Sequence, residues 1–168
     1  MVAISMGSGA SGGGIPLRII TGTSVCDGHD AAIGIMRRVM QAEGAEVIHL
    51  GHNRGSEEFA MAAIQEDAHA IAITSYQGGA VGQFQHVRDV LDEHGYHDVS
   101  IVGGGGGTIL PAELRYLRDR GIARVYSPDD GREMGLVGMV KDAMEYSYRA
   151  DLMDESRFHF DGPVTAAD

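Results

Sequence analysis

The stretch PLRIITGTSVCDGHDAAIGIMRRVMQAEGAEVIHLG, at residues 16–51, combines two apolar runs with a loop and a segment of helical periodicity. Residues 16–22 and 45–51 are short and mostly apolar, as buried strands are. Residues 30–43 between them carry apolar side chains at helical spacing and end before Gly44, a residue typical of helix ends. This order predicts two parallel strands joined by a right-handed helical crossover.

The same alternation continues along the chain. We expect further strands at residues 69–75, 99–104 and 123–127, and further helices at residues 56–67, 82–94, 111–120 and 131–146. Ser56 is expected to cap the N-terminus of its helix, because a serine hydroxyl accepts a hydrogen bond from a free backbone N–H. Five strands alternating with five helices predict an α/β fold with a flavodoxin-like, doubly wound, five-stranded parallel sheet.

Length and composition limit what the chain contains. Its 168 residues suffice for one domain. We expect a flexible leader at residues 1–14, the domain at residues 15–147, and a tail or linker at residues 148–168. With 13 Lys and Arg against 24 Asp and Glu, the net charge is −11, which argues against nucleic-acid binding. The single cysteine, Cys26, excludes a disulfide scaffold. No secretion signal and no apolar run of the ~18 residues that span a membrane is recognisable, so we expect a cytoplasmic protein.

The loops at the carboxyl ends of the predicted strands are unusual. In a doubly wound sheet, ligands bind at this edge, where the strand order reverses. The segments concerned are residues 23–29, 75–79 and 103–107, and the last is a run of five glycines. The run fits neither the G-x-G-x-x-G dinucleotide fingerprint nor a P-loop, and one or two glycines would suffice for a tight turn. We interpret it as backbone that closely approaches a large, flat ligand.

His29 is the candidate metal ligand among the eight histidines, because it lies at this edge with Asp27 two residues before it. A metal-bound imidazole usually donates its other N–H to a carboxylate. Alternatively, Asp27 forms a turn and Asp30 caps the first helix. No cluster of His, Cys or Asp has the spacing of a zinc site built from protein ligands alone. The pattern therefore favours a metal that brings most of its own ligands, as in a tetrapyrrole-like cofactor.

These segments resemble the cobalamin-binding domain of acyl-CoA mutases, above all the fused isobutyryl-CoA mutase type, related to methylmalonyl-CoA mutase. The resemblance covers roughly residues 17–147. It rests on DGHDAAIGIMRRVMQAEGAEVIHLGHNR at 27–54, AITSYQGG at 72–79, IVGGGGG at 101–107 and ARVYSPDDGREMGL at 123–136. The wider patterns D-x-H-x-x-G and S-x-L have Ala32 and Gln77 at their last positions here.

The resemblance implies that adenosylcobalamin binds with its dimethylbenzimidazole base displaced, and that His29 is the lower axial ligand of cobalt. Asp27 would be the hydrogen-bond partner of His29, and the resemblance implies a catalytic role for both residues. The nucleotide tail would enter a slot between the first strand and the first helix, where Ser75 hydrogen-bonds the base. The implied cofactor-binding residues are Gly28, His29, Asp30, Ala31, Ser75, Tyr76, Gly79, Gly103, Gly104, Gly105, Gly106, Tyr126, Ser127 and Pro128.

In such mutases, homolysis of the Co–C bond starts a radical 1,2-rearrangement of an acyl-CoA, of the isobutyryl-CoA/butyryl-CoA or methylmalonyl-CoA type. The implied partners are an acyl-CoA-binding barrel domain or large subunit and, in the fused type, a GTPase chaperone. We expect this chain alone to lack the barrel and to be inactive. The alternatives are a corrinoid carrier for methyl transfer, and a cobalamin-free flavodoxin-like module that serves in signalling or binds a flavin, carbohydrate or nucleotide.

Overall fold

The computed structural model describes residues 16–24, 30–75, 79–104 and 109–153. One parallel sheet has the strand order β2-β1-β3-β4-β5, which is the predicted doubly wound arrangement. The strands are β1 (Arg18–Thr23), β2 (Glu46–His49), β3 (Ala70–Thr74), β4 (Ser100–Gly104) and β5 (Arg124–Tyr126). The helices are α1 (Asp30–Ala42), α2 (Ser56–Gln65), α3 (Ala80–Glu93), α4 (Pro111–Asp119) and α5 (Pro128–Met153). The order of strands and helices along the chain confirms the fold class.

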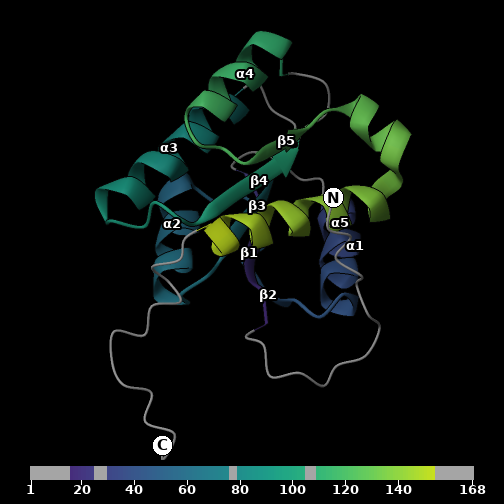
Figure 1. Cartoon of the computed structure of the whole chain (residues 1–168), viewed down its shortest axis with the longest axis horizontal. Helices are drawn as coiled ribbons and strands as arrows, with labels where there is room; N and C mark the ends of the chain where they lie inside the picture. Colours follow the sequence, from purple (N-terminus) through teal and green to yellow (C-terminus); the bar gives the residue numbers. More distant parts are fainter. Residues whose placement is uncertain (1–15, 25–29, 76–78, 105–108, 154–168) are drawn as a thin grey trace, which may run out of the picture.

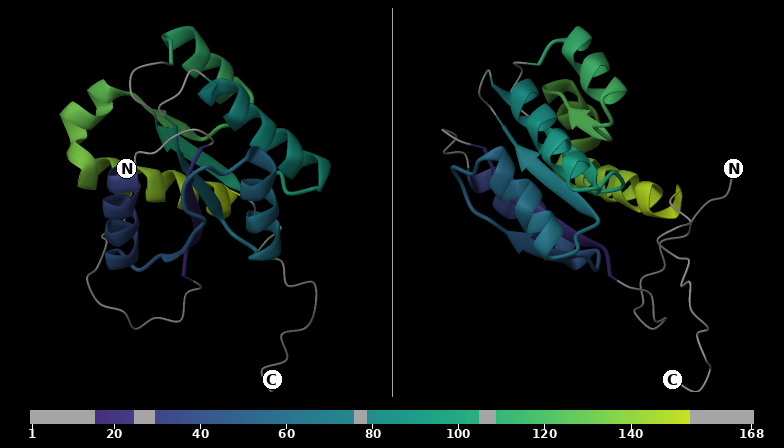
Figure 2. Two further views of the ribbon diagram at one scale, coloured as in Figure 1. Left: turned by 180° about the vertical axis from the view of Figure 1, so that it is seen from behind. Right: turned by 90° about the vertical axis from the view of Figure 1, so that its left-hand side faces the viewer.

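Helices cover both faces of the sheet, α1 and α5 one face and α2, α3 and α4 the other (Figures 1 and 2). Successive strand residues point to opposite faces, so each strand supplies two separate cores. On β1, Ile19 packs in the core under α1 and α5, whereas Ile20 packs in the core under α2 and α3. None of the helices in the described part of the chain is long and apolar enough to cross a membrane.

Two strand glycines allow phenylalanine rings to lie against the sheet. A Cβ on Gly22 would stand 2.8 Å from the ring of Phe59 in α2. A Cβ on Gly103 would stand 2.6 Å from the carbonyl oxygen of Ile73 and closer still to the ring of Phe84 in α3. Both rings are fully buried. Core packing therefore accounts for Gly103, the first residue of the glycine run, without any ligand.

The start of α2 differs from the sequence expectation. Gly55 is the N-cap, and Ser56 is the first helical residue. The N–H of Gly55 donates to Oε2 of Glu58 at 2.8 Å, and Arg54 holds the other carboxylate oxygen at 2.9 Å. A glutamate three residues after the cap thus satisfies the backbone donor, which leaves the Ser56 hydroxyl to face the carbonyl oxygen of Gln83 at 3.4 Å.

Helix α5 begins earlier and ends later than the predicted 131–146, and it continues past residue 147, where we expected the tail to start. Its last turns include Arg149, Ala150 and Leu152, which are good helix formers. Gly135 interrupts the helix with φ 67° and ψ 170°, a conformation essentially restricted to glycine. We call residues 128–134 and 136–153 the first and second segments of α5.

Replacing Gly103 by Ala is expected to destabilise the domain, because the added methyl group has no room beside Phe84 and the Ile73 carbonyl. Overpacking of this kind costs about 1–3 kcal/mol, which urea unfolding followed by circular dichroism measures. Gly34→Ala is the matched control, since Gly34 lies inside α1 with nothing within 4 Å of the added carbon. It should raise the free energy of unfolding by about 0.5–1 kcal/mol. Equal effects of both substitutions would contradict the packing argument.

Candidate functional site

A cavity of about 210 Å³ lies between α1 and α5, at the carboxyl ends of β3, β4 and β5. Helix α1 lines it with Ile33, Met36 and Met40, and the second segment of α5 lines it with Met139, Val140 and Ala143. The floor is formed by strand residues, and the first turns of α5 contribute Pro128 and Gly131 to the lining. Helix α1 starts directly after the Asp27–His29 motif, so the cavity adjoins that motif along the chain.

The polar side chains of the cavity wall are paired with other protein groups. The Thr74 hydroxyl lies 3.1 Å from the Thr23 hydroxyl. The hydroxyl of Tyr126 donates to Asp142 at 2.7 Å, and the hydroxyl of Ser127 donates to Asp130 at 2.9 Å. The other lining side chains are aliphatic or methionine. Within the described residues, the cavity therefore presents an apolar surface.

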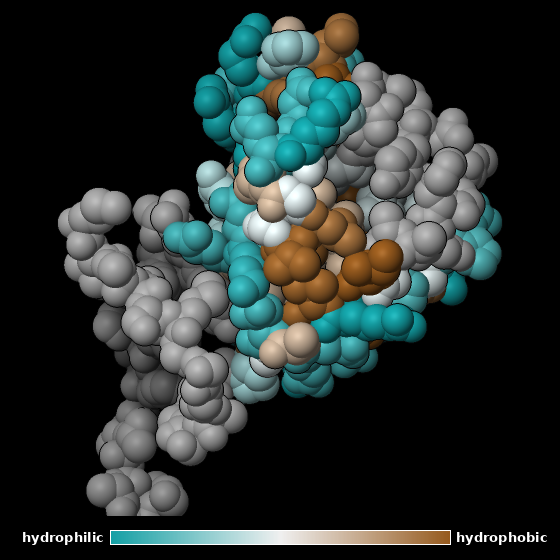
Figure 3. Space-filling model, turned by 90° about the vertical axis from the view of Figure 1, so that its right-hand side faces the viewer, coloured by the Kyte–Doolittle hydropathy of each residue, from teal (hydrophilic) through white to brown (hydrophobic). Residues whose placement is uncertain are grey.

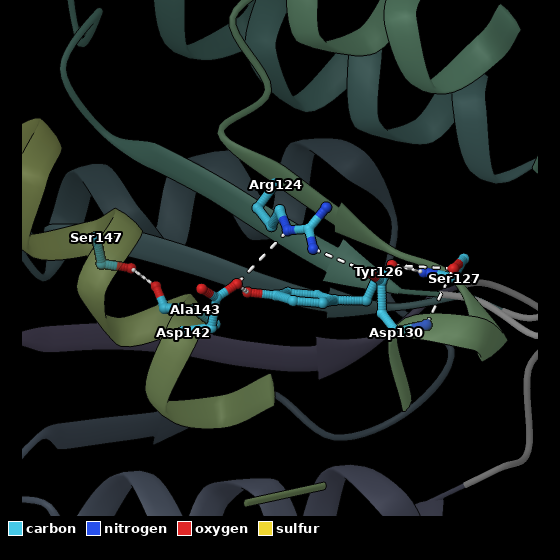
Figure 4. A network of polar contacts seen from close by, with 7 residues as sticks. All are labelled: Arg124, Tyr126, Ser127, Asp130, Asp142, Ala143 and Ser147. Atoms are coloured by element: carbon cyan, nitrogen blue, oxygen red, sulfur yellow. Dashed lines mark hydrogen bonds and ion pairs between the residues drawn. The ribbon is translucent and has the colours of Figure 1, made fainter. Parts of the chain in front are cut away.

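A charged network of Arg124, Asp130 and Asp142, none of which is among the lining residues, holds Tyr126 and Ser127 (Figure 4). The Arg124 guanidinium lies 3.0 Å from Asp130, 3.5 Å from Asp142 and 4.8 Å from the centre of the Tyr126 ring. Burial, and next the bond to Asp142, raise the pKa of Tyr126, so its hydroxyl keeps its proton and remains a donor. Burial opposes ionisation of Asp130, but hydrogen bonds from Ser127 and the charge of Arg124 lower the pKa of that carboxyl.

The network connects β5 to both segments of α5. Asp130 belongs to the first segment and Asp142 to the second, and the break at Gly135 lies between them. The guanidinium of Arg124, on β5, contacts both carboxylates. Figure 4 shows the Tyr126 ring extending from β5 toward Asp142 on α5. One arginine and one tyrosine thus fix the cavity wall on the α5 side.

Ser75, directly after β3, is buried beside the first strand. The Ser24 hydroxyl donates to the Ser75 hydroxyl at 3.0 Å, and the backbone N–H of Ser75 donates to the carbonyl of Gly104 at 2.9 Å. No hydrogen bond between described residues uses the hydroxyl hydrogen of Ser75. Neither Ser75 nor a residue of β1 is among the described residues that line the cavity, which lies further along the sheet than the slot expected beside the first strand.

The structure brings some of the predicted site residues together. The cavity wall includes five of them: Gly103, Gly104, Tyr126, Ser127 and Pro128. Asp30 and Ala31 form the first turn of α1, and Gly79 is the exposed N-cap of α3. The remaining six lie outside the described residues: Asp27, Gly28, His29, Tyr76, Gly105 and Gly106.

The sequence analysis did not predict that methionines line the cavity. Met36 and Met40 repeat at helical spacing along α1, which is also the pattern of an ordinary core helix. Met139 belongs to a series of methionines along the last helix, and such residues are most often adaptable core. The periodicity shows which face of a helix is turned toward the sheet, but not whether the space beneath that face is filled.

Apolar side chains of α1 and α5 are also exposed at the surface of the molecule. Ile35 on α1 and Val137 on α5 are 49% and 51% exposed. Figure 3 shows a hydrophobic area on this side, bordered by hydrophilic residues. Among the described residues, no group of three or more His, Cys, Asp or Glu side chains is placed to hold a metal ion.

Solved structures share this fold across several classes of protein. A cobalamin-binding protein from Desulfitobacterium hafniense aligns with a TM-score of 0.62 at 18% identity, over 78% of this chain and 59% of that one. The signal receiver domain of NarL from Mycobacterium tuberculosis aligns with a TM-score of 0.56 at 12% identity, over 79% and 97%. At these identities the likeness shows the fold alone.

Sequence comparison is more specific. The chain is 55% identical over 126 residues to a fused isobutyryl-CoA mutase from Cupriavidus metallidurans, covering 75% of this chain and 12% of that protein. It is 30% identical over 115 residues to the 2-hydroxyisobutanoyl-CoA mutase small subunit of Aquincola tertiaricarbonis, covering 68% of this chain and 82% of that subunit. The chain thus spans about an eighth of the fused mutase that it matches.

The family model of the B12 binding domain matches residues 17–134, which include β1 to β5, the cavity floor and the first turns of α5. This match agrees with the resemblance of the Asp27–His29, Ser75 and glycine-run segments. The chain belongs to the B12-binding domain family.

Proposed function

We propose that this chain binds adenosylcobalamin, with the dimethylbenzimidazole base of the cofactor displaced from cobalt, as the cofactor-binding part of an acyl-CoA mutase. The observation that carries the proposal is the apolar cavity between α1 and α5, which adjoins the Asp27–His29 motif. The similarity to mutases of isobutyryl-CoA and 2-hydroxyisobutanoyl-CoA supports the choice of reaction class.

The cavity fits the displaced base in size and in chemistry. Apolar cavities of about 150 Å³ bind benzene, and this one measures about 210 Å³, which suits a two-ring aromatic base. Gly104 leaves bare backbone on the floor, where a Cβ would reach 3.4 Å from Tyr126. Ser75 lies outside the described lining of the cavity. Its hydroxyl hydrogen, which no hydrogen bond between described residues uses, is the proposed donor to the edge of the base that extends out of the cavity toward the first strand.

His29 is the proposed lower axial ligand of cobalt. It immediately precedes α1, whose Ile33 and Met36 line the cavity, so the ligand and the wall for the base follow one another along the chain. Asp27 would accept the second N–H of the imidazole and so hold it in one tautomer. When bound, adenosylcobalamin supplies homolytic Co–C cleavage, the start of a 1,2-rearrangement of an acyl-CoA. The chain's own share is to hold the cofactor and to present the imidazole.

The acyl-CoA must be bound by another part of the enzyme. This chain corresponds to about an eighth of the fused isobutyryl-CoA mutase, and its described cavity is too small for both an acyl-CoA and a nucleotide tail. We therefore propose an acyl-CoA-binding barrel domain or large subunit as partner, with a GTPase chaperone where the parts are fused. The chain alone is proposed to be inactive, and its location to be the cytoplasm.

Replacing His29 by Ala is expected to remove cobalt ligation by the protein. Visible absorbance should show saturable binding of adenosylcobalamin to the unaltered chain, with the spectrum of base displacement and histidine ligation. In His29→Ala the histidine-ligated spectrum should be lost and the affinity reduced at least tenfold, since about 1.4 kcal/mol of lost ligation suffices for that factor. His86→Ala, at an exposed position on α3, is the matched control. Identical spectra for the two variants would exclude His29 as the ligand.

Filling the cavity is expected to interfere with the nucleotide tail alone. Ala143→Leu adds volume at a lining position, whereas Val137→Leu adds a carbon on the exposed side of the same helix. Ala143→Leu should weaken adenosylcobalamin binding at least tenfold, the effect of about 1.4 kcal/mol of overpacking. Binding of cobinamide, which has the corrin but no nucleotide base, should be unchanged, as equilibrium dialysis would show. Equal losses for both corrinoids would place the base elsewhere.

A further inference from the structure

We infer that the cavity selects the lower base of the corrinoid, accepting a benzimidazole and disfavouring a purine. The inference rests on the proposed function and concerns the same cavity. A dimethylbenzimidazole carries methyl groups on its outer ring. Adenine carries an exocyclic amine and ring nitrogens there, each of which needs a hydrogen-bond partner when it leaves water. The decisive question is therefore whether the described wall offers such partners.

The polar side chains of the wall are committed to charged or buried partners. Tyr126 and Ser127 donate to the carboxylates of Asp142 and Asp130, which Arg124 also contacts. Hydrogen bonds to a carboxylate are about twice as strong as neutral ones, so turning either hydroxyl toward a purine would break a strong bond. Thr74 pairs with the buried Thr23 on the neighbouring strand β1. The ring nitrogens of a purine, which need hydrogen-bond donors, would therefore gain none from Tyr126 or Ser127 without a loss inside the protein.

The backbone of the floor is committed as well. The registered pairs Ile73–Gly103 and Thr74–Gly104 belong to the β3–β4 ladder, and Gly104 also pairs with Tyr126 in β5. The carbonyl of Gly104 accepts the N–H of Ser75 at 2.9 Å. The N–H and C=O groups of a paired strand point along the sheet toward the neighbouring strands. A ligand above the floor therefore meets the flat face of the backbone. Such a floor suits the flat face of a base and not a polar edge.

The opposing walls are soft and apolar. Met36 and Met40 line the cavity from α1, and Met139 lines it from α5. Thioethers make favourable contacts with aromatic rings and adapt to their shape, so they suit a methylated benzimidazole. An apolar pocket rejects a more polar isostere by only about tenfold to a hundredfold. We therefore expect a preference of that size and not an absolute exclusion.

The test compares two adenosylcobamides that differ in the lower base alone, one with dimethylbenzimidazole and one with adenine. The amount of each retained by the chain in ultrafiltration gives its affinity, with cobinamide as the tail-free reference. Benzimidazole binds cobalt more strongly than adenine in free cobamides, so its displacement costs more and lowers the measured preference. We expect the dimethylbenzimidazole form to bind at least about tenfold more tightly than the adenine form.

A matched pair of variants removes the cost of displacing each base from the comparison. Met36→Gln places an amide on the wall at nearly the same length, whereas Ile35→Gln places it at the adjacent position, which is 49% exposed and outside the cavity. Dividing the affinity ratio of the variant by that of the unaltered chain cancels the cost of displacing each base. We expect Met36→Gln to lower the preference at least threefold and Ile35→Gln to leave it unchanged.

The outcomes separate this inference from the proposed function. Equal affinities for the two cobamides, together with a ratio that Met36→Gln does not change, would overturn the selectivity and leave cobalamin binding in place. A preference for the adenine form in the unaltered chain would also overturn the selectivity. Retention of neither cobamide would overturn the proposed function itself, and the inference with it.

Discussion

The hydrogen bond of 2.7 Å from the Tyr126 hydroxyl to Asp142 holds the wall on which the cavity depends. Tyr126 spans the distance from β5 to α5, and Arg124 beside it neutralises the carboxylate. The hydroxyl of Tyr126 is hydrogen-bonded to Asp142, which does not line the cavity. The ring can therefore border the cavity without leaving the hydroxyl hydrogen free for a water molecule. Arg124 reaches Asp142 through an ion pair of 3.5 Å and not through a hydrogen bond, so the bond from Tyr126 is what fixes this carboxylate in place. The apolar character of the cavity is thus maintained by charges that lie outside it.

The two faces of the sheet are packed in different ways, and this difference locates the site. Under α2 and α3, the rings of Phe59 and Phe84 fill the space down to the strand glycines. Under α1 and α5, the strands present Ala72 and Val102, and the helices present methionines, which together leave about 210 Å³ open. A core that is complete on one face can tolerate a cavity on the other. The densely packed face therefore supports the face that is proposed to take the ligand.

Much of the fold could be predicted from the sequence, because apolar runs and helical periodicity depend on local residue order. The strand order and the succession of ten elements are as that alternation predicts, although α5 is longer at both ends than expected. Ser56 was predicted as the cap from its residue type, and this was wrong. The N–H of Gly55 is satisfied by the side chain of Glu58, a geometry that residue types alone do not reveal. Gly104, Tyr126 and Ser127 were predicted as site residues because they lie in segments that resemble the family, and they line the cavity. Met36 and Met139 were not, because a cavity is a property of three-dimensional packing and not of periodicity.

The close fit of Gly103 to Phe84 has a consequence for how sequences of this kind diverge. The backbone at residue 103 lies so near the ring that a single methyl group has no place. A side chain larger than hydrogen at residue 103 would require both a smaller residue 84 and a shift of the β3 backbone at Ile73. Substitution at residue 103 therefore depends on α3 and β3 at once, which ties the start of the glycine run to the core under α2 and α3.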